Sequence, residues 1–231
     1  MTTKIQRSGE TYKITIIYIA DHRTPASIFE KIRNLKFDGF SIIALTLEEQ
    51  IYLEQKHGLE GFILENSNHR GNLGYLIAYL KEFDFVISMD DDNFPLSTDF
   101  IESHRSRLGD QSNSMKKVIS SPTHAYNNCL LLDESTFLHP RGYPFQFRNK
   151  NSQSYTSTTL KISEVGVNAG MRTIAPDVDA ISCLINKQEF ENVSDVPDIV
   201  LSSDTYCPIN SQNTSLLRKY IPAYYFVNMG S

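Results

Sequence analysis

The chain has 231 residues, of which 40% are hydrophobic and 21% charged, and its formal net charge is −5. This apolar content argues against intrinsic disorder, and the acidic balance argues against a broad nucleic-acid-binding surface. Cys129, Cys183 and Cys207 are far apart and form no CxxC motif, which predicts reduced thiols in a cytoplasmic protein. No apolar run approaches the roughly 20 residues of a membrane helix, and the polar start does not fit a signal peptide.

The first 92 residues alternate between strand and helix patterns. Strands are predicted at 13–20, 40–45, 61–64 and 83–89. Thr24 and Pro25 predict the N-cap and first turn of one helix. Thr46 and Glu49 form a capping box that opens a second helix, with Gly58 as its stop. A third helix is predicted from the spacing of its apolar face, which comprises Leu73, Leu76, Ile77 and Leu80.

This alternation predicts the α/β class, with a mostly parallel sheet and helices on both of its faces. In such sheets, ligands bind outside the carboxyl ends of the strands. Asp21, the segment 66–72 and the run Asp90 to Asp92 are therefore expected along one edge. The second half of the chain is less regular. Strands are expected there at 118–121, 129–132 and 180–185, an exposed loop at 149–159, and a short helix at 213–220.

Three consecutive aspartates follow the strand predicted at 83–89: Asp90, Asp91 and Asp92. Adjacent carboxylates repel one another, and a bound divalent cation removes that cost. Hard oxygen ligands suit Mn²⁺ or Mg²⁺, which also bridge the diphosphate of a nucleotide. Because residues two apart in extended chain point the same way, Asp90 and Asp92 are predicted as metal ligands. The alternative interpretation is a solvated acidic turn.

Two further patterns contain arginines. Arg70 precedes a predicted helix, whose N-terminus attracts phosphate, and is predicted to neutralise a diphosphate; an ordinary loop-to-helix transition is the alternative. Arg141 and Arg148 flank a Pro/Gly/aromatic stretch and are candidates for phosphate contacts, against a surface turn with a small aromatic core. Asp177 and Asp179 add two carboxylates, for which a turn before a strand is the alternative.

Three segments occur in an order and spacing similar to those of the reversibly glycosylated polypeptides, the UDP-arabinopyranose mutases of plants and their bacterial relatives. They are 85–95 (FVISMDDDNFP), 141–148 (RGYPFQFR) and 176–180 (PDVDA). The segment 207–211 (CPINS) also resembles that family. The resemblance runs from about Arg70 to Tyr225. It implies a GT-A (Rossmann-like) nucleotide-sugar-binding fold over 1–231, with a nucleotide-binding half at 1–92 and an irregular acceptor-side half at 93–231. It also implies a UDP-sugar donor and a divalent metal, usually Mn²⁺.

Roles follow from the matching positions. The aspartate triplet serves the metal and the nucleotide, which maps onto Asp90, Asp91 and Asp92. Arg141 matches the arginine linked to reversible self-glycosylation, and Arg148 matches a second required arginine. The segment 68–72 resembles the donor-binding loop of inverting glycosyltransferases, so Asn72 joins Asp21 and Arg70 as candidates for nucleotide binding. Asp177 or Asp179 is a candidate base toward an acceptor hydroxyl.

The leading hypothesis is metal-dependent transfer from a UDP-sugar donor to a sugar or glycan acceptor. Two alternatives are a UDP-sugar pyranose/furanose mutase and a non-catalytic UDP-sugar-binding subunit. The family's chains continue with an acidic-aromatic motif that this sequence lacks, so the sequence is either a fragment or without part of the acceptor side. The sugar, the acceptor, the stereochemical outcome and the homo- or hetero-oligomeric state stay open.

Overall fold

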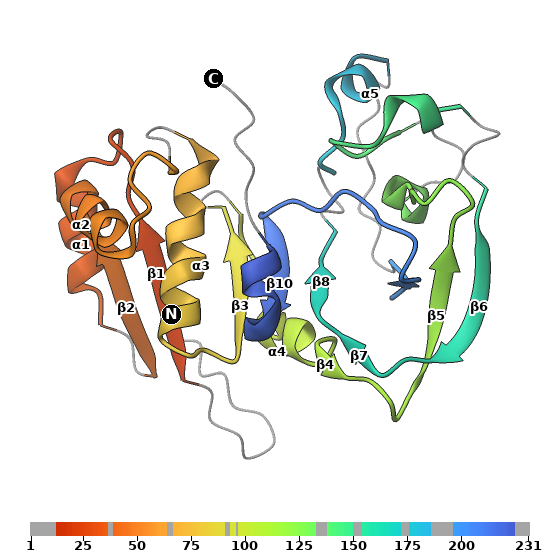
Figure 1. Cartoon of the computed structure of the whole chain (residues 1–231), viewed down its shortest axis with the longest axis horizontal. Coiled ribbons are helices and arrows are strands. Elements are labelled where there is room, and N and C mark those ends of the chain that lie inside the picture. Colours follow the sequence, from red (N-terminus) through yellow and green to blue (C-terminus); the bar gives the residue numbers. More distant parts are fainter. Residues whose placement is uncertain are drawn as a thin grey trace. The chain divides into compact units, whose positions relative to one another are not determined.

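A computed structural model describes residues 13–36, 39–63, 67–90, 93–95, 97–132, 138–149, 154–171, 176–185 and 196–224. The chain divides into two compact units (Figure 1). The first comprises 1–86, 95–100 and 217–231, and the second comprises 87–94 and 101–216. None of the helices in the described ranges has the length and apolar content that crossing a membrane would require. The chain is mixed α/β, in agreement with the predicted class, but its described strands form several small sheets with antiparallel pairs and not one mostly parallel sheet.

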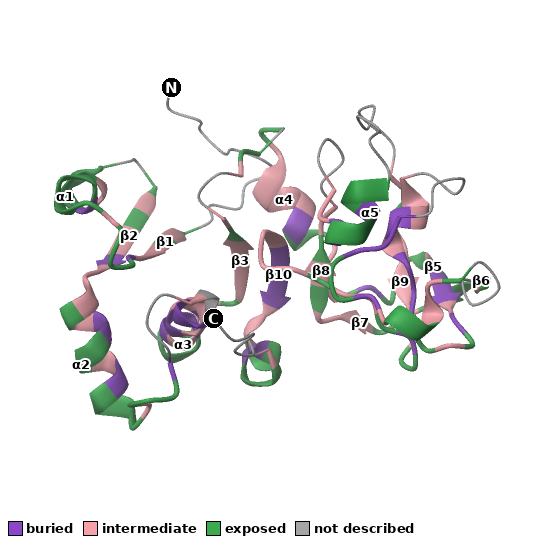
Figure 2. Cartoon of the chain, turned by 90° about the horizontal axis from the view of Figure 1, so that it is seen from above, coloured by how far each residue is buried: buried purple, intermediate pink, exposed green. Residues whose placement is uncertain are grey.

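The first unit is built on two parallel strands, β1 (Ile14–Ile19) and β2 (Phe40–Leu45). Both are rich in β-branched residues, which suit a pleated, packed surface. Helix α1 (Ala26–Asn34) connects them and lies on one face of the pair, whereas α2 (Leu47–His57) and α3 (Gly71–Leu80) lie on the other (Figure 2). The predicted strands and the three predicted helices of this region are therefore found, except for the strand at 61–64.

Alternate side chains of β1 pack on opposite faces. Tyr18 and Ala20 pack in a cluster with Phe29 of α1. Ile17 and Ile19 lie on the side of Gly74 in α3, where a Cβ would be 3.7 Å from Ile19. The strand is thus covered on both faces, as expected for parallel strands in α/β proteins.

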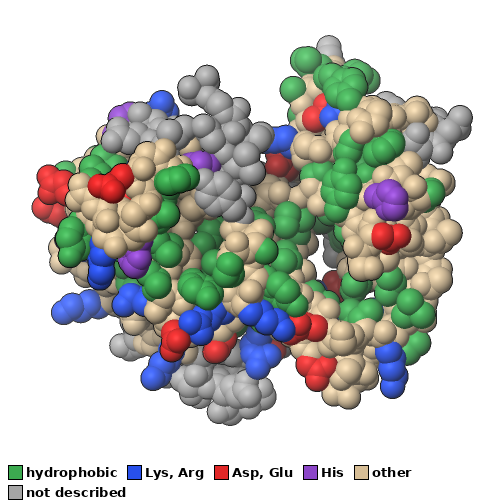
Figure 3. Space-filling model, in the orientation of Figure 1, with side chains coloured by type: hydrophobic (Ala, Val, Ile, Leu, Met, Phe, Trp, Pro, Cys, Tyr) green, Lys and Arg blue, Asp and Glu red, His purple; other side chains and the backbone are tan. Residues whose placement is uncertain are grey.

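A distant segment completes the first unit. The 3-10 helix η5 (Arg218–Ala223) packs against α3. Arg218 donates from its backbone to the Asp84 carbonyl, and from its side chain to the Tyr79 carbonyl and to Glu82, at 3.0, 3.1 and 3.1 Å. Figure 3 shows side chains of both charges gathered over the C-terminal end of α3 and over η5.

The second unit contains small sheets and short helices. One sheet has the order β3 (Phe85–Met89), β10 (Asn213–Leu217) and β8 (Val167–Ala169), with β10 and β8 antiparallel. A second pairs β4 (Gly109–Asp110) with β7 (Glu164–Val165). In the third, β5 (Met115–Ser120) lies antiparallel to β6 (Thr156–Lys161) and parallel to β9 (Val200–Leu201). Figure 2 shows β6 exposed and β10 buried.

The helices of the second unit are short. Those within the described ranges are α4 (Phe100–Arg105), η2 (Asn128–Leu131), η3 (Phe145–Phe147) and α5 (Ala180–Ile185). Phe100, the first residue of α4, is assigned to the first unit, as are Phe85 and Val86 of β3 and Leu217 of β10.

Three predictions for the second half are wrong. In each case the hydrogen bonds of an Asp or Asn side chain favour another secondary structure than the one predicted. Residues 180–185 form α5 and not a strand, since Asp179 accepts hydrogen bonds from the first N–H groups of this helix. The strand predicted at 129–132 is the 3-10 helix η2, capped by Asn127. The helix predicted at 213–220 is β10 followed by η5, because Asn213 pairs with a histidine side chain instead of capping a helix.

Smaller corrections concern turns. Within the loop predicted at 149–159, β6 begins at Thr156, and residues 150–153 lie outside the described residues. Residues 61–63 form a turn in which Gly61 has a φ of +78°, and Leu64 lies outside the described residues. Helix α1 has Pro25 as its N-cap, because the Thr24 hydroxyl hydrogen-bonds to Asp21 instead of capping the helix.

Candidate functional site

A cavity of about 400 Å³ lies at the carboxyl end of β1 in the first unit. The turn from β1 to α1 forms one wall, and the start of η1 (Asn68–Arg70) and α3 forms another. The structure therefore brings together two residues predicted to bind nucleotide, Asp21 and Arg70. The lining residues are Ile19, Ala20, Asp21, His22, Arg23, Ser67, Arg70 and Gly71. Asn72 of α3 is not among them.

Asp21 orders the turn on its side of the cavity. Its carboxylate accepts hydrogen bonds from the Arg23 backbone at 2.7 Å and from the Thr24 hydroxyl at 3.3 Å. Its own N–H donates to the Thr24 hydroxyl at 3.1 Å. The turn is thus fixed locally, while Asp21, His22 and Arg23 remain exposed.

Arg70 is held rigidly in the opposite wall. Its Nε donates to Gln50 Oε1 at 2.6 Å, and its Nη2 lies 3.1 Å from Glu54 Oε1. The two charged side chains are only 6% and 10% exposed. Gln50 and Glu54 can act together because residues four apart share one face of a helix. Arg70 therefore has a fixed position, and its charge is partly balanced by Glu54.

Gln50 links this arginine to the sheet. Its Nε2 donates to the backbone carbonyls of Ala20 at 2.7 Å and Leu45 at 3.0 Å, which follow or end the two parallel strands. The side chain is fully buried. One amide thus joins the carboxyl ends of β1 and β2 to Arg70.

The helix that faces the cavity begins in an ordered way. The Ser67 hydroxyl accepts a hydrogen bond from the His69 backbone at 3.0 Å, and η1 then continues into α3. The first turns of a helix leave backbone N–H groups without intrahelical partners, and they favour anions. Gly71 lines the cavity, whereas Gly74 packs on β1.

The predicted metal ligands are only partly described. Asp90 follows β3, is half-buried, and its carbonyl accepts a hydrogen bond from Asn93 at 3.2 Å. Asp91 and Asp92 lie outside the described residues. Across the ranges that the structure describes, no three His, Cys, Asp or Glu side chains converge as metal ligands. The carboxylate of Asp90 is a hard donor that suits Mn²⁺ or Mg²⁺.

In the second unit, the two arginine- and aspartate-bearing motifs lie side by side. Pro140 and Val178 form an antiparallel bridge. On either side of it, the Arg141 backbone donates to the Asp177 carbonyl at 3.2 Å, and the Asp179 backbone donates to the His139 carbonyl at 2.9 Å. The backbone therefore aligns the two motifs, and each predicted arginine meets one predicted aspartate.

The first pair is open to solvent on its arginine side. Arg141 Nη2 lies 2.7 Å from Asp177 Oδ1, and the Arg141 side chain is 66% exposed. A turn presents it: the Tyr143 backbone donates to the Pro140 carbonyl at 3.0 Å, and Gly142 has a φ of +85°. Such a turn requires glycine at its third position.

The second pair is enclosed. Arg148 Nη1 lies 3.2 Å from Asp179 Oδ1, and both side chains are largely buried. Asp179 also accepts hydrogen bonds from the Ile181 and Ser182 backbones and from the Ser182 hydroxyl, at 2.9, 3.2 and 2.7 Å. Burial raises the pKa of Asp179, but the bonds from Ser182 and the charge of Arg148 outweigh it, so the pKa lies below its ordinary value. This carboxylate is engaged in holding α5 and Arg148.

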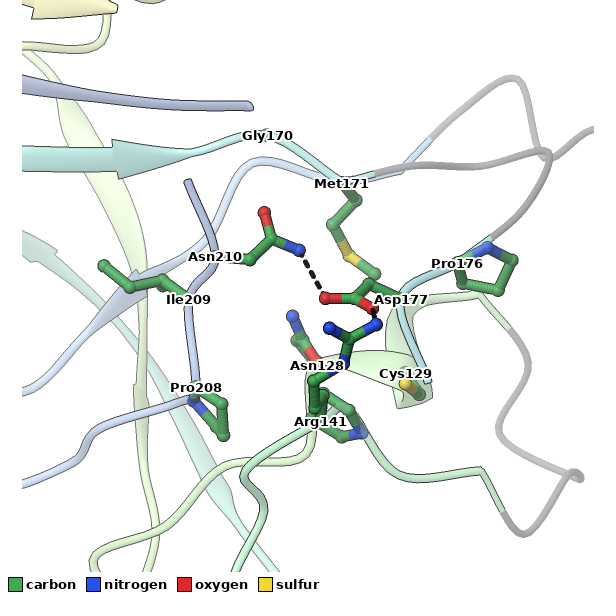
Figure 4. A pocket seen from close by; sticks show the side chains of 11 residues that line it. Asn128, Cys129, Arg141, Gly170, Met171, Pro176, Asp177, Pro208, Ile209 and Asn210 are labelled. Carbon is green, nitrogen blue, oxygen red and sulfur yellow. Dashed lines mark hydrogen bonds and ion pairs between the residues drawn. The ribbon is translucent and has the colours of Figure 1, made fainter. Parts of the chain in front are cut away.

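A small cavity of about 40 Å³ adjoins the first pair (Figure 4). Asp177 uses its second oxygen to accept from Asn210 Nδ2 at 2.8 Å. Among the described residues, the buried Oδ1 of Asn128 has no hydrogen-bond partner, an arrangement that costs about 1–3 kcal/mol unless a ligand or water satisfies it. The cavity is lined by Asn128, Cys129, Pro140, Arg141, Gly170, Met171, Pro176, Asp177, Pro208, Ile209 and Asn210.

Cys129 in this lining is not an activated nucleophile. Burial, and secondly the charge of Asp179, raise the pKa of its thiol to about 12. The thiol is therefore neutral near neutral pH, and a thiolate is what attacks or binds metal.

Sequence reasoning missed several residues of both cavities. Arg23 follows a predicted strand end and could have been found from that position. Gln50 left a weaker signal, a polar residue on the buried face of a helix. Asn210 lies in the segment 207–211, which the resemblance marks without giving a role, and Asn128 left no signal, because it reaches the cavity only through long-range folding.

The chain was compared with models of protein families and with curated proteins, and neither comparison gives a match.

Proposed function

We infer that the chain is a glycosyltransferase of GT-A type that takes a UDP-sugar as donor. The observation that carries this proposal is the cavity at the carboxyl end of β1, between the Asp21 turn and the start of α3. Ligands of open α/β sheets bind at such strand ends, and about 400 Å³ lies within the range of small-molecule sites.

The lining suits a nucleoside diphosphate. Arg70 and Arg23 bring positive charge to the cavity, and the helix N-terminus adds backbone donors. Asp21, on the opposite wall, offers a carboxylate that can accept from ribose hydroxyls. Because Gln50 and Glu54 hold Arg70 in place, little side-chain freedom is lost when a diphosphate binds.

A divalent cation belongs to the proposal. Asp90, together with Asp92 outside the described residues, would hold Mn²⁺ or Mg²⁺, hard cations that bind oxygen ligands, phosphate oxygens included. Of the two candidate bases, Asp177 is preferred, because its carboxylate lines a cavity whereas that of Asp179 is saturated.

The test measures turnover of a panel of UDP-sugars by the whole chain, with and without glycan acceptors. The release of UDP is the quantity measured. Arg23→Ala is expected to lower kcat/KM roughly tenfold, the effect of losing one charge-assisted contact of about 1.5 kcal/mol. Lys31→Ala, an exposed cation on α1, is the matched control and is expected to leave turnover unchanged.

Other outcomes would redirect the proposal. Chromatography of the nucleotide sugars detects a change of the sugar ring form. Such a change without release of UDP would favour a mutase. Equal turnover in Arg23→Ala and Lys31→Ala would contradict the placement of the donor site.

A further inference from the structure

The short helix α5 exposes its apolar side chains and buries a polar one. Ser182 is its buried residue, at 3% exposure. Ile181, Leu184 and Ile185 are 45%, 77% and 66% exposed, and the two remaining positions are exposed as well (Figure 2). Figure 3 shows apolar side chains at the edge of the second unit where Figure 1 places α5. Helices of globular proteins bury their apolar stripe, so this surface indicates a partner.

Polar contacts hold α5 on the second unit. The carboxylate of Asp179 accepts hydrogen bonds from the Ile181 and Ser182 backbones. The Ser182 hydroxyl donates to Asp179 at 2.7 Å and accepts from the His139 backbone at 3.1 Å. The helix is therefore positioned through its polar side, and all three of its large apolar side chains stay available to a partner.

Exposed side chains surround the helix. Because successive residues of an α-helix are about 100° apart, the five exposed positions cover every side of α5 except the one that Ser182 occupies. A groove on a protein takes up one face of a helix. Lipid, in contrast, encloses all sides of a segment that enters it, so the arrangement favours a lipid surface over a protein.

The size of the surface points the same way. A stable protein interface uses roughly 20–30 residues from each partner, whereas α5 offers three large apolar side chains. Insertion into a bilayer surface scales with the apolar area buried and needs no complementary shape. The six residues of α5 span about 9 Å, close to the depth of about 5–10 Å that interfacial segments reach.

The charges at the base of α5 favour a headgroup without net charge. Arg148 and Asp179 neutralise each other and are largely buried, and the exposed Arg141 is paired with Asp177. The whole chain has a formal net charge of −5, which disfavours anionic lipid. Because salt screens ionic attraction but not apolar burial, the expected binding to a zwitterionic bilayer is insensitive to salt.

We propose that α5 is a membrane-surface anchor, whose side chains Ile181, Leu184 and Ile185 enter the outer part of a zwitterionic bilayer. The anchor goes beyond the proposed function and does not depend on it, because α5 contributes no residue to the lining of either cavity described above.

Cosedimentation of the whole chain with phosphatidylcholine vesicles tests the anchor. Leu184→Gln and Ile185→Gln are each expected to lower the partition coefficient roughly tenfold, because each removes an apolar side chain from the lipid. Leu160→Gln is the matched control and is expected to leave it unchanged, since Leu160 is 50% exposed on β6 of the same unit. Circular dichroism checks that each variant is folded.

Fluorescence gives a second measurement, because the chain contains no tryptophan. In Leu184→Trp the emission is expected to shift to shorter wavelength when phosphatidylcholine vesicles are added, and brominated lipids are expected to quench it. In Leu160→Trp neither change is expected. This measurement tests the anchor even if a glutamine variant fails to fold.

Four results would overturn the anchor. The first is no cosedimentation of the natural chain with phosphatidylcholine vesicles. The second is binding to anionic vesicles alone that high salt abolishes. The third is an equal loss of partitioning in Leu184→Gln and Leu160→Gln. The fourth is a blue shift of Leu184→Trp that rises with protein concentration without lipid, which would identify a second copy of the chain as the partner.

Discussion

At the scale of single residues, Gln50 is the side chain on which the geometry of the larger cavity depends. It is fully buried and joins the Ala20 and Leu45 carbonyls to Arg70. No side chain of similar length can donate to two carbonyls and accept from a guanidinium except an amide. The position of Arg70 therefore follows from a residue that lies outside the cavity lining.

We predict that Gln50→Ala lowers the free energy of unfolding by at least about 2 kcal/mol, because it leaves buried polar partners unsatisfied. Gln55→Ala is the control, since Gln55 lies in the same helix and is exposed. Urea unfolding of both variants measures the difference. Equal stability of the two variants would show that the network around Arg70 contributes nothing.

The two candidate aspartates show what a sequence pattern leaves out. Asp177 and Asp179 are equivalent in the sequence, two residues apart in one motif. In the structure Asp177 lines a cavity, whereas Asp179 caps α5 and holds Arg148. Their difference arises from Asn210 and Ser182, and the spacing of the two aspartates does not encode either contact.

At the scale of elements, replacing each of two glycines by alanine is expected to change the stability of the chain in opposite directions. A Cβ on Gly74 in helix α3 would meet Ile19 of β1 at 3.7 Å, an ordinary contact, whereas a Cβ on Gly170 would overlap the side-chain amide of Asn213. Gly74→Ala is expected to stabilise by up to about 1 kcal/mol through helix propensity. Gly170→Ala is expected to destabilise by about 1–3 kcal/mol through overpacking. Thermal unfolding compares them, and a loss of stability in Gly74→Ala would contradict the packing of α3 on β1.

His104 joins α4 to the sheet of β10 and β8. Its Nε2 lies 2.9 Å from Asn213 Oδ1, and its Nδ1 lies 3.0 Å from Asn168 Nδ2 and 2.8 Å from Ser215 Oγ. An amide N–H facing Nδ1 requires that nitrogen to accept, so the imidazole is neutral. Burial holds its pKa below the ordinary value.

A pH dependence follows, with a definite sign. His104 takes up a proton more readily in the unfolded chain than in the folded one. Above about pH 6.5 it is neutral in both states, so its protonation does not reduce the free energy of unfolding there. The free energy of unfolding falls as the pH drops from there through the lower folded-state pKa. Burial, and secondly Arg148, lower the pKa of His139 in the same direction, so His104→Gln is needed to isolate one group. We expect the variant to lose less stability between about pH 7 and about pH 5. An unchanged pH profile would contradict the buried, neutral His104.

The local patterns of the first unit predicted its elements well. A capping box and a left-handed Gly58 bound α2, as expected from the sequence. The same patterns failed in the second unit, where Asn127, Asp179 and Asn213 direct the backbone through contacts formed only on folding. Short apolar runs there fit either a strand or a helix, and tertiary contacts decide.

At the scale of the whole molecule, two units with different chemistry divide the candidate functions. The first contains the larger cavity, with Asp21, Arg23 and Arg70. The second contains Asp90, the paired arginines and aspartates, and the small polar cavity. We propose nucleotide binding for the first unit and sugar recognition for the second.

Thermal unfolding of the whole chain with UDP and other nucleotides, each with and without Mn²⁺, tests this account most directly. At about 100 times its dissociation constant a ligand stabilises by roughly 2.7 kcal/mol, or several degrees for a chain of this size. The account predicts stabilisation by UDP in the presence of Mn²⁺, reduced in Arg23→Ala and in Asp90→Asn but not in Lys31→Ala. The absence of a shift with every nucleotide, with and without metal, would contradict it.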